Sequence, residues 1–212
     1  MHISDGVLSA PVLAAGFVGT AALTAVTIRK MDMEEIPKVS VLTAVFFVAS
    51  LIHVPIGPSS VHLILNGLVG VVLGRRAFPA ILLGIILQAL LFGHGGVSVI
   101  GVNALMMGSG ALVAYGIWRQ RRRFHIAQRE FVFGALAGAT GVFVSGVILA
   151  LALATTGKAF LATAGYALAA HIPIMVVEAL VVGAAASFLA RVKPQILADA
   201  EPAAALGAGA AS

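Results

Sequence analysis

Long, continuous apolar stretches make up most of this sequence, and they constrain its fold more than any motif does. Of the 212 residues, 60% are hydrophobic and 10% are charged, and the mean hydropathy is +1.08. A water-soluble domain cannot bury so much apolar surface, whereas a bilayer solvates it. The stretches do not alternate as the strands of a membrane β-barrel do. We therefore expect an all-α fold, a polytopic membrane helical bundle.

Seven of these stretches are long enough, or nearly so, to cross a bilayer as helices. They are residues 7–28, 39–56, 61–74, 79–93, 98–118, 131–155 and 160–190. With the N-terminus outside, 12 of the 13 basic residues fall in segments that face the cytoplasm, and Lys158 is the exception. Lys and Arg accumulate on that side of a membrane. We predict about seven transmembrane helices, with the N-terminus out and the C-terminus in.

The chain is expected to form one transmembrane domain over residues 1–193. Residues 1–6 lack the basic start of a signal peptide. The Ala- and Gly-rich residues 194–212 predict a disordered cytoplasmic tail. The sequence has no cysteine, which excludes disulfides and thiolate metal sites. Its basic residues lie between apolar segments, where they set topology, so the pI near 10.3 does not indicate nucleic-acid binding.

Residues 1–6, Met-His-Ile-Ser-Asp-Gly, can close a metal chelate. The α-amine of Met1, the backbone nitrogen of His2 and the His2 imidazole can occupy three adjacent corners of a square plane, a geometry that suits Ni(II) or Cu(II). The chelate requires that the initiator methionine is retained, and a bulky second residue generally blocks its removal. We expect residues 1–6 to fold into the site. Asp5 either caps the first helix or orients the His2 imidazole.

The predicted topology also places most histidines on the outer side, which suggests metal capture there. The alternative is a chance scatter of interfacial histidines. The turn-forming residues 57–60 precede an apolar run and predict a helix start. His62 would then lie in the first helical turn, with Asn66 one turn later on the same face. We predict His62 as the fourth ligand, with Ser60 and Asn66 beside it; alternatively, the serines only cap the helix and Asn66 packs against a neighbour.

Two more polar clusters are expected to support the site or line its entry path. Gln88, His94 and Asn103 form the first, and the glycines around His94 leave the backbone free to approach another element closely. His171 and Glu178 form the second, about two helical turns apart in the last apolar stretch. A glutamate within a membrane rarely faces lipid. Glu178 would hold the N-terminal loop, accept a proton or bond to neighbouring helices.

Taken in order, these motifs resemble the NikM/CbiM family, the substrate-capture subunits of energy-coupling-factor nickel and cobalt transporters. The resemblance covers roughly residues 1–190 and rests on Met1–Leu8, Pro58–Leu68, Gln88–Gly96 and Asn103. It implies that the metal is held by the Met1 amine, the His2 backbone nitrogen, the His2 imidazole and His62. It also implies partners: a transmembrane coupling protein, two cytoplasmic ATPases and often a small accessory membrane subunit.

The resemblance implies a multi-pass protein of the cell inner (cytoplasmic) membrane, with the lipid bilayer around it, and a transport subunit rather than an enzyme. The sequence has no Gly-x-x-x-x-Gly-Lys-Ser/Thr motif, so ATP hydrolysis is assigned to the partners. The stretch before His62 lacks the longer polar run of cobalt members, which favours Ni(II). The alternative substrate is Co(II), taken up for cobalamin biosynthesis.

Two rival functions belong to other classes. A membrane metallohydrolase would need an open coordination position and a base beside it, and the sequence has no His-Glu-x-x-His motif. A self-sufficient cation permease would need paired carboxylates along a pathway, whereas Glu178 is the one acid deep in the apolar stretches. Both rivals are weaker than metal capture.

Overall fold

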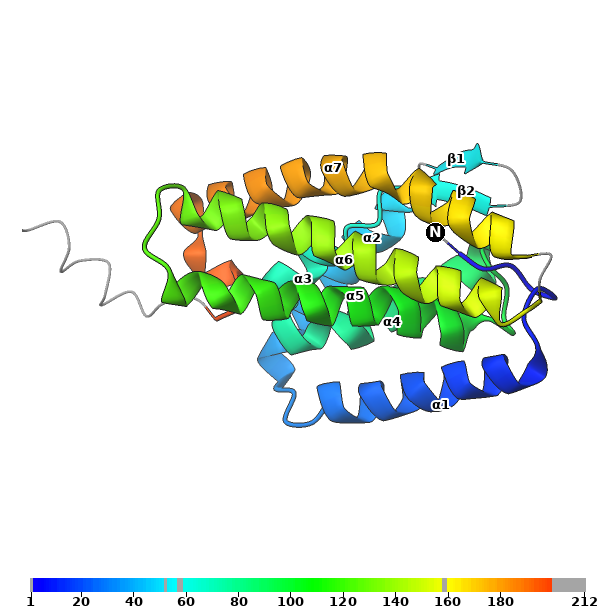
Figure 1. The fold of residues 1–212 in the computed structure, drawn as a ribbon. Helices are drawn as coiled ribbons and strands as arrows, with labels where there is room; N and C mark the ends of the chain where they lie inside the picture. Colours follow the sequence, from blue (N-terminus) through cyan, green and yellow to red (C-terminus); the bar gives the residue numbers. More distant parts are fainter. Residues whose placement is uncertain (1, 52, 57–58, 158–159, 200–212) are drawn as a thin grey trace, which may run out of the picture.

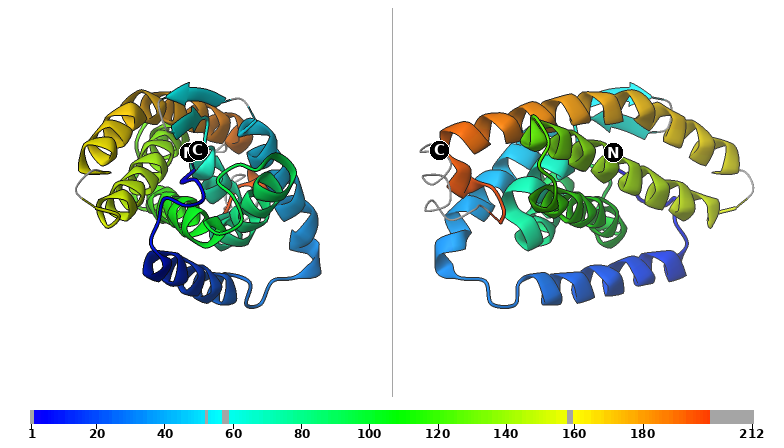
Figure 2. Two further views of the ribbon diagram at one scale, coloured as in Figure 1. Left: turned by 90° about the vertical axis from the view of Figure 1, so that its right-hand side faces the viewer. Right: turned by 60° about the vertical axis from the view of Figure 1, so that its left-hand side comes forward.

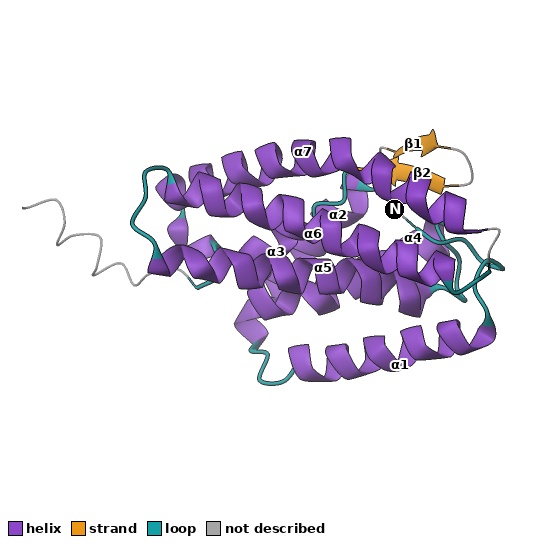
Figure 3. Cartoon of the chain, viewed as in Figure 1, coloured by secondary structure: helices purple, strands orange, loops and turns teal. Residues whose placement is uncertain are grey.

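The expected all-α architecture is confirmed. A computed structural model of the chain describes residues 2–51, 53–56, 59–157 and 160–199, and helices dominate these ranges (Figures 1 and 3). The α-helices are α1 (Ala10–Thr27), α2 (Ile36–Ala49), α3 (Asn66–Leu73), α4 (Ala77–Phe92), α5 (Ile100–Gln120), α6 (Arg129–Ala154) and α7 (Phe160–Val192). Short 3₁₀ turns are η1 (Met33–Glu35), η2 (Gly74–Arg76), η3 (Arg121–Arg123) and η4 (Pro194–Ile196).

The long helices establish a multi-pass membrane protein. By length and composition alone, five helical stretches in the described residues are candidates to cross a membrane: Ala10–Thr27, Asn66–Phe92, Ile100–Arg123, Arg129–Ala154 and Phe160–Val192. The second of these, Asn66–Phe92, is divided by the η2 turn into α3 and α4. Helix α2 has 14 residues, fewer than the roughly 20 that a full crossing takes. The predicted count of seven complete spans and the direction of the termini therefore stay predictions.

The predicted span 39–56 is wrong at its C-terminal end. Helix α2 ends at Ala49, and the chain then forms an antiparallel hairpin of β1 (His53–Ile56) and β2 (Ser59–His62). Pro55 explains the break, because proline has no N–H to donate and its ring clashes within a helix. In the hairpin, Pro55 pairs with Ser60, and His53 lies opposite His62. Apolarity alone did not distinguish this short strand from a helix.

Helix α3 begins deep inside the bundle. Asn66 contacts Gly141 and Ser145 of α6, and further along α3, Gly70 packs against Ala111 of α5. The chain then reverses at η2, so α3 and α4 run in opposite directions beside α5. The irregular backbone before α3 lies in the protein core, where Ile64 and Leu65 are buried. Non-helical backbone at membrane depth is tolerated in such a place because protein groups can satisfy it.

Helices α5, α6 and α7 pack side by side, and α1 lies along the outside of the bundle (Figures 1 and 2). Glycines allow α1 to approach α5 closely: Gly101 lies against the backbone of Phe17, and Thr20 Oγ1 donates a hydrogen bond of 2.6 Å to the Gly101 carbonyl. Of the six large apolar side chains on α1, those of Phe17, Val18 and Val26 are exposed. Such a surface suits contact with lipid.

The two ends of the bundle differ in character. Loops 28–35 and 121–128 and the segment that follows α7 lie at one end, shown on the left in Figure 1, and the N-terminal loop lies at the other. Arg76 of η2 ties that first end together by donating to the carbonyls of Thr27, Arg29 and Lys30. The basic residues in the described part of the chain gather at this end.

The predicted start of a disordered tail at residue 194 is too early. Residues 194–196 form η4, and the residues that follow dock on the bundle: the Ala198 N–H donates to the Val71 carbonyl at 2.9 Å, and Trp118 Nε1 donates to the Ala198 carbonyl at 3.1 Å. Low sequence complexity did not reveal these backbone contacts. Residues 200–212 lie outside the described residues.

Candidate metal-binding site

The extended N-terminal segment of the chain, here called the N-terminal strand although it pairs in no sheet, enters the bundle and is held there through its backbone. His2 and Ile3 are buried, at 8% and 3% exposure. Asn103, near the start of α5, pairs with both backbone groups of Ile3: the Ile3 N–H donates to Asn103 Oδ1 at 3.0 Å, and Asn103 Nδ2 donates to the Ile3 carbonyl at 3.1 Å. This two-point clamp fixes the residue that follows His2. The expectation that the N-terminus folds into the protein agrees with this geometry.

Asp5 fastens the same strand to the loop between α4 and α5. Its N–H donates to the Gly95 carbonyl at 2.7 Å, and its Oδ1 accepts from the N–H of Ser98 at 3.1 Å and from the Ser98 hydroxyl at 2.5 Å. The expected role of Asp5 as a cap of the first helix is wrong, because Ser9 occupies the N-cap position of α1. The expected role of Asp5 in orienting the His2 imidazole stays a prediction.

The loop that receives the N-terminus brings His94 onto His2. The two imidazole rings stack, with their centroids 5.9 Å apart and their planes at 26°. Gly95 makes this approach possible: it adopts φ +77°, and a Cβ there would lie 2.7 Å from Asn103 Nδ2. The prediction that glycines beside His94 permit close backbone approach is confirmed.

Gln88, near the end of α4, holds this loop through hydrogen bonds. Its carbonyl accepts from the His94 N–H at 3.2 Å, and its buried side chain donates to Ser50 Oγ at 2.7 Å. Ser50 follows α2, so Gln88 connects the His94 loop to the chain that leads into the hairpin. The side chain of Gln88 is a support for the loop in this arrangement.

The predicted position of His62 in the first turn of a helix is wrong. His62 ends strand β2, and α3 begins four residues later at Asn66. Asn66 donates to Gly141 O at 3.1 Å and to Ser145 Oγ at 2.9 Å, so its amide holds α3 to α6, as the packing interpretation expected. Met1 lies outside the described residues, as do the side chains of Ser60 and His62. Their predicted roles stay predictions.

Glu178 holds the backbone that leads away from His62. Its Oε1 accepts from the N–H of Ile64 at 2.5 Å and from the N–H of Leu65 at 2.7 Å. The carboxyl group is fully buried, and Leu65 adopts the left-handed φ of +55°. A buried backbone N–H needs a partner, and Glu178 supplies it for two in a row. It holds the loop after His62, and the expectation that it also holds the N-terminal loop stays a prediction.

His171 lies on the N-terminal half of α7, beside the region of His2. It is 2% exposed, and its Nδ1 donates to the carbonyl of Ala167 at 2.5 Å. Ala167 and His2 line the same cavity of about 70 Å³. His171 therefore belongs to the wall of the site region.

The arrangement as a whole holds two backbone segments in place. Asn103, Asp5 and the glycine loop fix the residues after His2, and Glu178 fixes those after His62. Among the side chains that the structure describes, which do not include those of residues 52–62, no group of three or more from His, Cys, Asp or Glu gathers around a common point. The predicted ligand set instead takes two of its four donors from an amine and a backbone nitrogen.

Sequence reasoning missed the partners that hold these groups. Ser98 pairs with Asp5, Ser50 with Gln88 and Ser145 with Asn66. For Ser98 a signal was present, because it follows the His94 glycine loop directly. Ser50 and Ser145 are single serines in apolar surroundings, and nothing in the sequence connects them to residues about 40 and 80 positions away.

Comparison with known protein families assigns the chain. Residues 2–196 match the family model described as the cobalt uptake substrate-specific transmembrane region, CbiM. The chain belongs to the CbiM family. This assignment confirms the resemblance to the NikM/CbiM substrate-capture subunits, and it makes the chain a membrane subunit of nickel or cobalt transport.

Named relatives agree with the family. A protein of Haemophilus influenzae whose name describes a metal transport protein is 37% identical over 199 residues, which are 93% of this chain and 97% of the relative. The fused nickel transport protein NikMN of Rhodobacter capsulatus is 30% identical over 204 residues, which cover 89% of this chain and 59% of that fused protein. This CbiM-family chain is thus similar to proteins named for nickel and for metal transport in general.

The fold of this CbiM-family chain matches a solved structure. The crystal structure titled as a transition metal transporter superposes with a TM-score of 0.76 at 24% identity, over 91% of this chain and 93% of that one. A truncated form of a transition metal transporter gives a TM-score of 0.73. The helical bundle therefore follows an architecture already seen in a crystal structure.

Proposed function

We propose that this chain is the substrate-binding membrane subunit of an energy-coupling-factor transporter and captures Ni(II) from outside the cell. The observation that carries the proposal is the clamp of Asn103 on Ile3, which holds a buried His2 inside the bundle. Nothing else in the fold explains why a membrane protein would bury its N-terminal strand with polar contacts. A chelate at the chain start gives that burial a purpose.

The metal would be held by four nitrogen donors: the Met1 amine, the His2 backbone nitrogen, the His2 imidazole and the His62 imidazole. Four nitrogens in a square suit Ni(II), whereas Zn(II) prefers a tetrahedron. Binding deprotonates or strongly polarises the His2 amide and requires neutral imidazoles, so affinity should fall as pH falls. The remaining residues, from Asp5 and Asn103 to Glu178, keep the two ligand-bearing segments in place.

Release and energy input would come from other proteins. We assign them to a transmembrane coupling protein, two cytoplasmic ATPases and a small accessory membrane subunit, in the cell inner membrane. A coupling protein that disturbed the loop after His62, or the loop that holds the N-terminus, would break the square of donors. The chain itself would remain a binding subunit with no hydrolytic step.

Co(II) is the second candidate substrate, because the matching family is described by cobalt uptake and a relative in Methanocorpusculum labreanum, 32% identical, is named for cobalt transport. A relative in Lactiplantibacillus plantarum, 31% identical, is named for nickel transport. Four nitrogen donors in a plane favour Ni(II). The choice between the two ions is therefore part of the experiment.

The test is calorimetric titration of the purified chain with Ni(II) and with Co(II), repeated on His2→Ala and His62→Ala. We expect tighter binding of Ni(II), and loss of binding in both variants. His125→Ala is the matched control, since His125 is exposed in the loop at the opposite end. Tighter binding of Co(II) would name cobalt as the substrate, and full binding by His2→Ala would refute the proposed site.

A further inference from the structure

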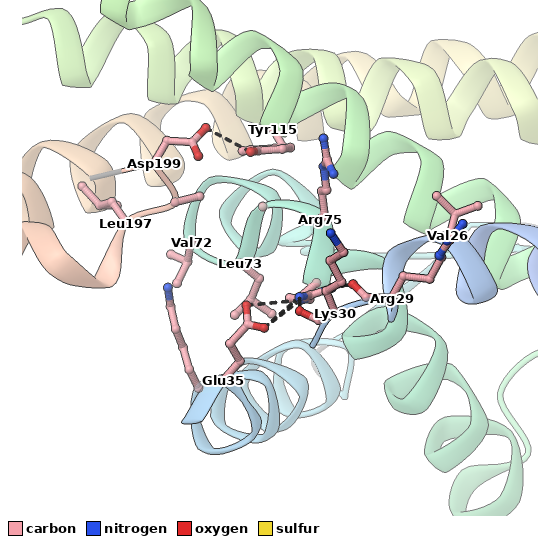
Figure 4. Close-up of a pocket in the computed structure, with 14 residues that line it drawn as sticks. Val26, Arg29, Lys30, Glu35, Val72, Leu73, Arg75, Tyr115, Leu197 and Asp199 are labelled. Carbon is pink, nitrogen blue, oxygen red and sulfur yellow. Dashed lines mark hydrogen bonds and ion pairs between the residues drawn. The ribbon is translucent and has the colours of Figure 1, made fainter. Parts of the chain in front are cut away.

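A second cavity, distant from the candidate metal site, lies at the opposite end of the bundle. Its volume is about 620 Å³. The walls come from the end of α1, the start of α2, the η2 turn, α5 and the docked segment 197–199 (Figure 4). This is the end where the basic residues gather.

Five cationic and two anionic side chains line this cavity. Both acids already have partners: Glu35 binds Arg76, with Nη2 2.8 Å from Oε2, and Asp199 accepts from the Tyr115 hydroxyl at 3.0 Å and pairs with Arg119 at 3.2 Å. Arg76 is further engaged with backbone carbonyls, to which its Nη1 and Nη2 donate. Both carboxylates therefore form their ion pairs with cations other than Arg29, Lys30, Lys38 and Arg75.

Four cations remain available: Arg29, Lys30, Lys38 and Arg75. In the described part of the chain, none of these four forms an ion pair with a carboxylate. They come from three separate segments, and Figure 4 shows Arg29, Lys30 and Arg75 around the cavity. Cations from separate segments that converge on one hollow form a site for an anion with several acceptor oxygens.

The surroundings indicate what carries that anion. Next to the four cations, the apolar side chains of Val26, Ile28 and Ile36 are 65%, 45% and 41% exposed. A soluble phosphate ion gains nothing from contact with an apolar surface, whereas the acyl chain of a lipid packs against it. Basic pockets between membrane helices at a bilayer surface bind lipid headgroups in this way.

We propose that the cavity lined by Arg29, Lys30, Lys38 and Arg75 binds the phosphate headgroup of an anionic phospholipid, with its acyl chains along α1 and α2. The lipid would connect three segments that meet through few other side chains, namely the α1–α2 loop, η1–α2 and η2. It would thereby stabilise the end of the bundle that faces away from the metal.

The proposal is tested by native mass spectrometry of the chain in neutral detergent, with phosphatidylglycerol, cardiolipin or phosphatidylcholine added. We expect the anionic lipids to be retained and phosphatidylcholine to be lost. The quadruple variant R29Q/K30Q/K38Q/R75Q should lose at least about tenfold in retention. The control R122Q/R123Q/R191Q/K193Q removes the same charge from the same end and should retain the lipid.

Three results would overturn the proposal. Equal retention of phosphatidylcholine by the wild type would remove the charge argument, and this measurement does not depend on any variant being folded. Equal loss in the control variant would mean general attraction to a basic surface. Displacement of the lipid by millimolar inorganic phosphate would assign the cavity to a soluble anion instead.

Discussion

Asn103 illustrates how the candidate site is built at the scale of single residues. Its amide matches one N–H and one C=O of Ile3, a pairing that an amide side chain can make and a carboxylate or an apolar side chain cannot. Gly95 and Asp5 add contacts to the same strand. His2 is thus positioned through the backbone of its neighbours.

Replacing Asn103 with leucine should weaken Ni(II) binding by about 10- to 100-fold, as the loss of groups that orient metal ligands typically does. The side chains are similar in size, but two buried backbone groups of Ile3 lose their partners. Calorimetric titration with Ni(II) measures the change. Thr20→Val is the control, since it removes a buried hydrogen bond between α1 and α5 that does not touch the N-terminal strand; an equal loss there would contradict a specific role of Asn103.

The sequence identified several polar residues that the structure places in hydrogen bonds around the candidate site, but it did not reveal their partners. Asn103, Gln88 and Glu178 were singled out because polar side chains are costly in an apolar stretch. Their partners are mostly backbone groups, which carry no sequence signal. Asp5 shows the consequence: the residue was expected at the site, yet its partner Ser98 is 93 positions away in the sequence.

At the scale of elements, apolar stretches predicted the helices well because burial in lipid is read directly from hydropathy. The exception is the region between Ser50 and Asn66. Its residues are apolar enough for a helix, but Pro55 interrupts the pattern and the chain forms a hairpin followed by an irregular turn. The stability of that turn depends on the distant Glu178, which no local pattern reveals.

Glu178→Leu should destabilise the protein by about 2 kcal/mol or more, because two buried N–H groups would lose their acceptor. The same change should weaken Ni(II) binding, since the segment after His62 is no longer fixed. Thermal unfolding in detergent and hydrogen exchange at Ile64 and Leu65 measure the two effects. Glu178→Gln keeps an acceptor oxygen, so its stability and exchange rates should lie between those of the wild type and those of Glu178→Leu. Unchanged hydrogen exchange in Glu178→Leu would contradict the assigned contact.

The close contact between α6 and α7 makes a second prediction for the elements. A Cβ on Gly138 would lie 2.5 Å from the backbone oxygen of Glu178, so Gly138→Ala must push the helices apart. We expect a loss of about 1–3 kcal/mol in the free energy of unfolding. Gly165→Ala on α7 has open space around it and should be neutral or stabilising. Equal thermal midpoints for the two variants would refute this packing.

The contribution of the Glu35–Arg76 pair, which joins η1 to η2, to the stability of the fold should depend on pH. The hydrogen bond from Arg76 lowers the pKa of Glu35 below its usual 4.5. A lowered folded-state pKa stabilises the fold above the unfolded value, and that contribution is lost as the pH falls through the folded value. The stability difference between the wild type and Glu35→Gln should therefore be constant above about pH 5.5 and shrink below 4.5. A difference that grew toward acid in thermal unfolding would contradict the contact.

Across the whole molecule, the two ends of the bundle have separate tasks. The end with the N-terminal strand gathers His2, His94 and the clamp of Asn103, and the other gathers the basic residues, the docked segment 194–199 and the second cavity. The helices between them are close-packed at glycines. We expect metal capture at the first end and contact with anionic lipid, and with the proposed partners, at the other.

The most direct test of metal capture at the chain start is calorimetric titration of Ni(II) into two forms of the protein. One has a free Met1 amine, and the other is acetylated on that amine. The chelate uses the Met1 amine, which acetylation converts to an amide, so we predict that the acetylated form loses Ni(II) binding while its thermal unfolding stays unchanged. Equal affinity in the two forms would contradict the account.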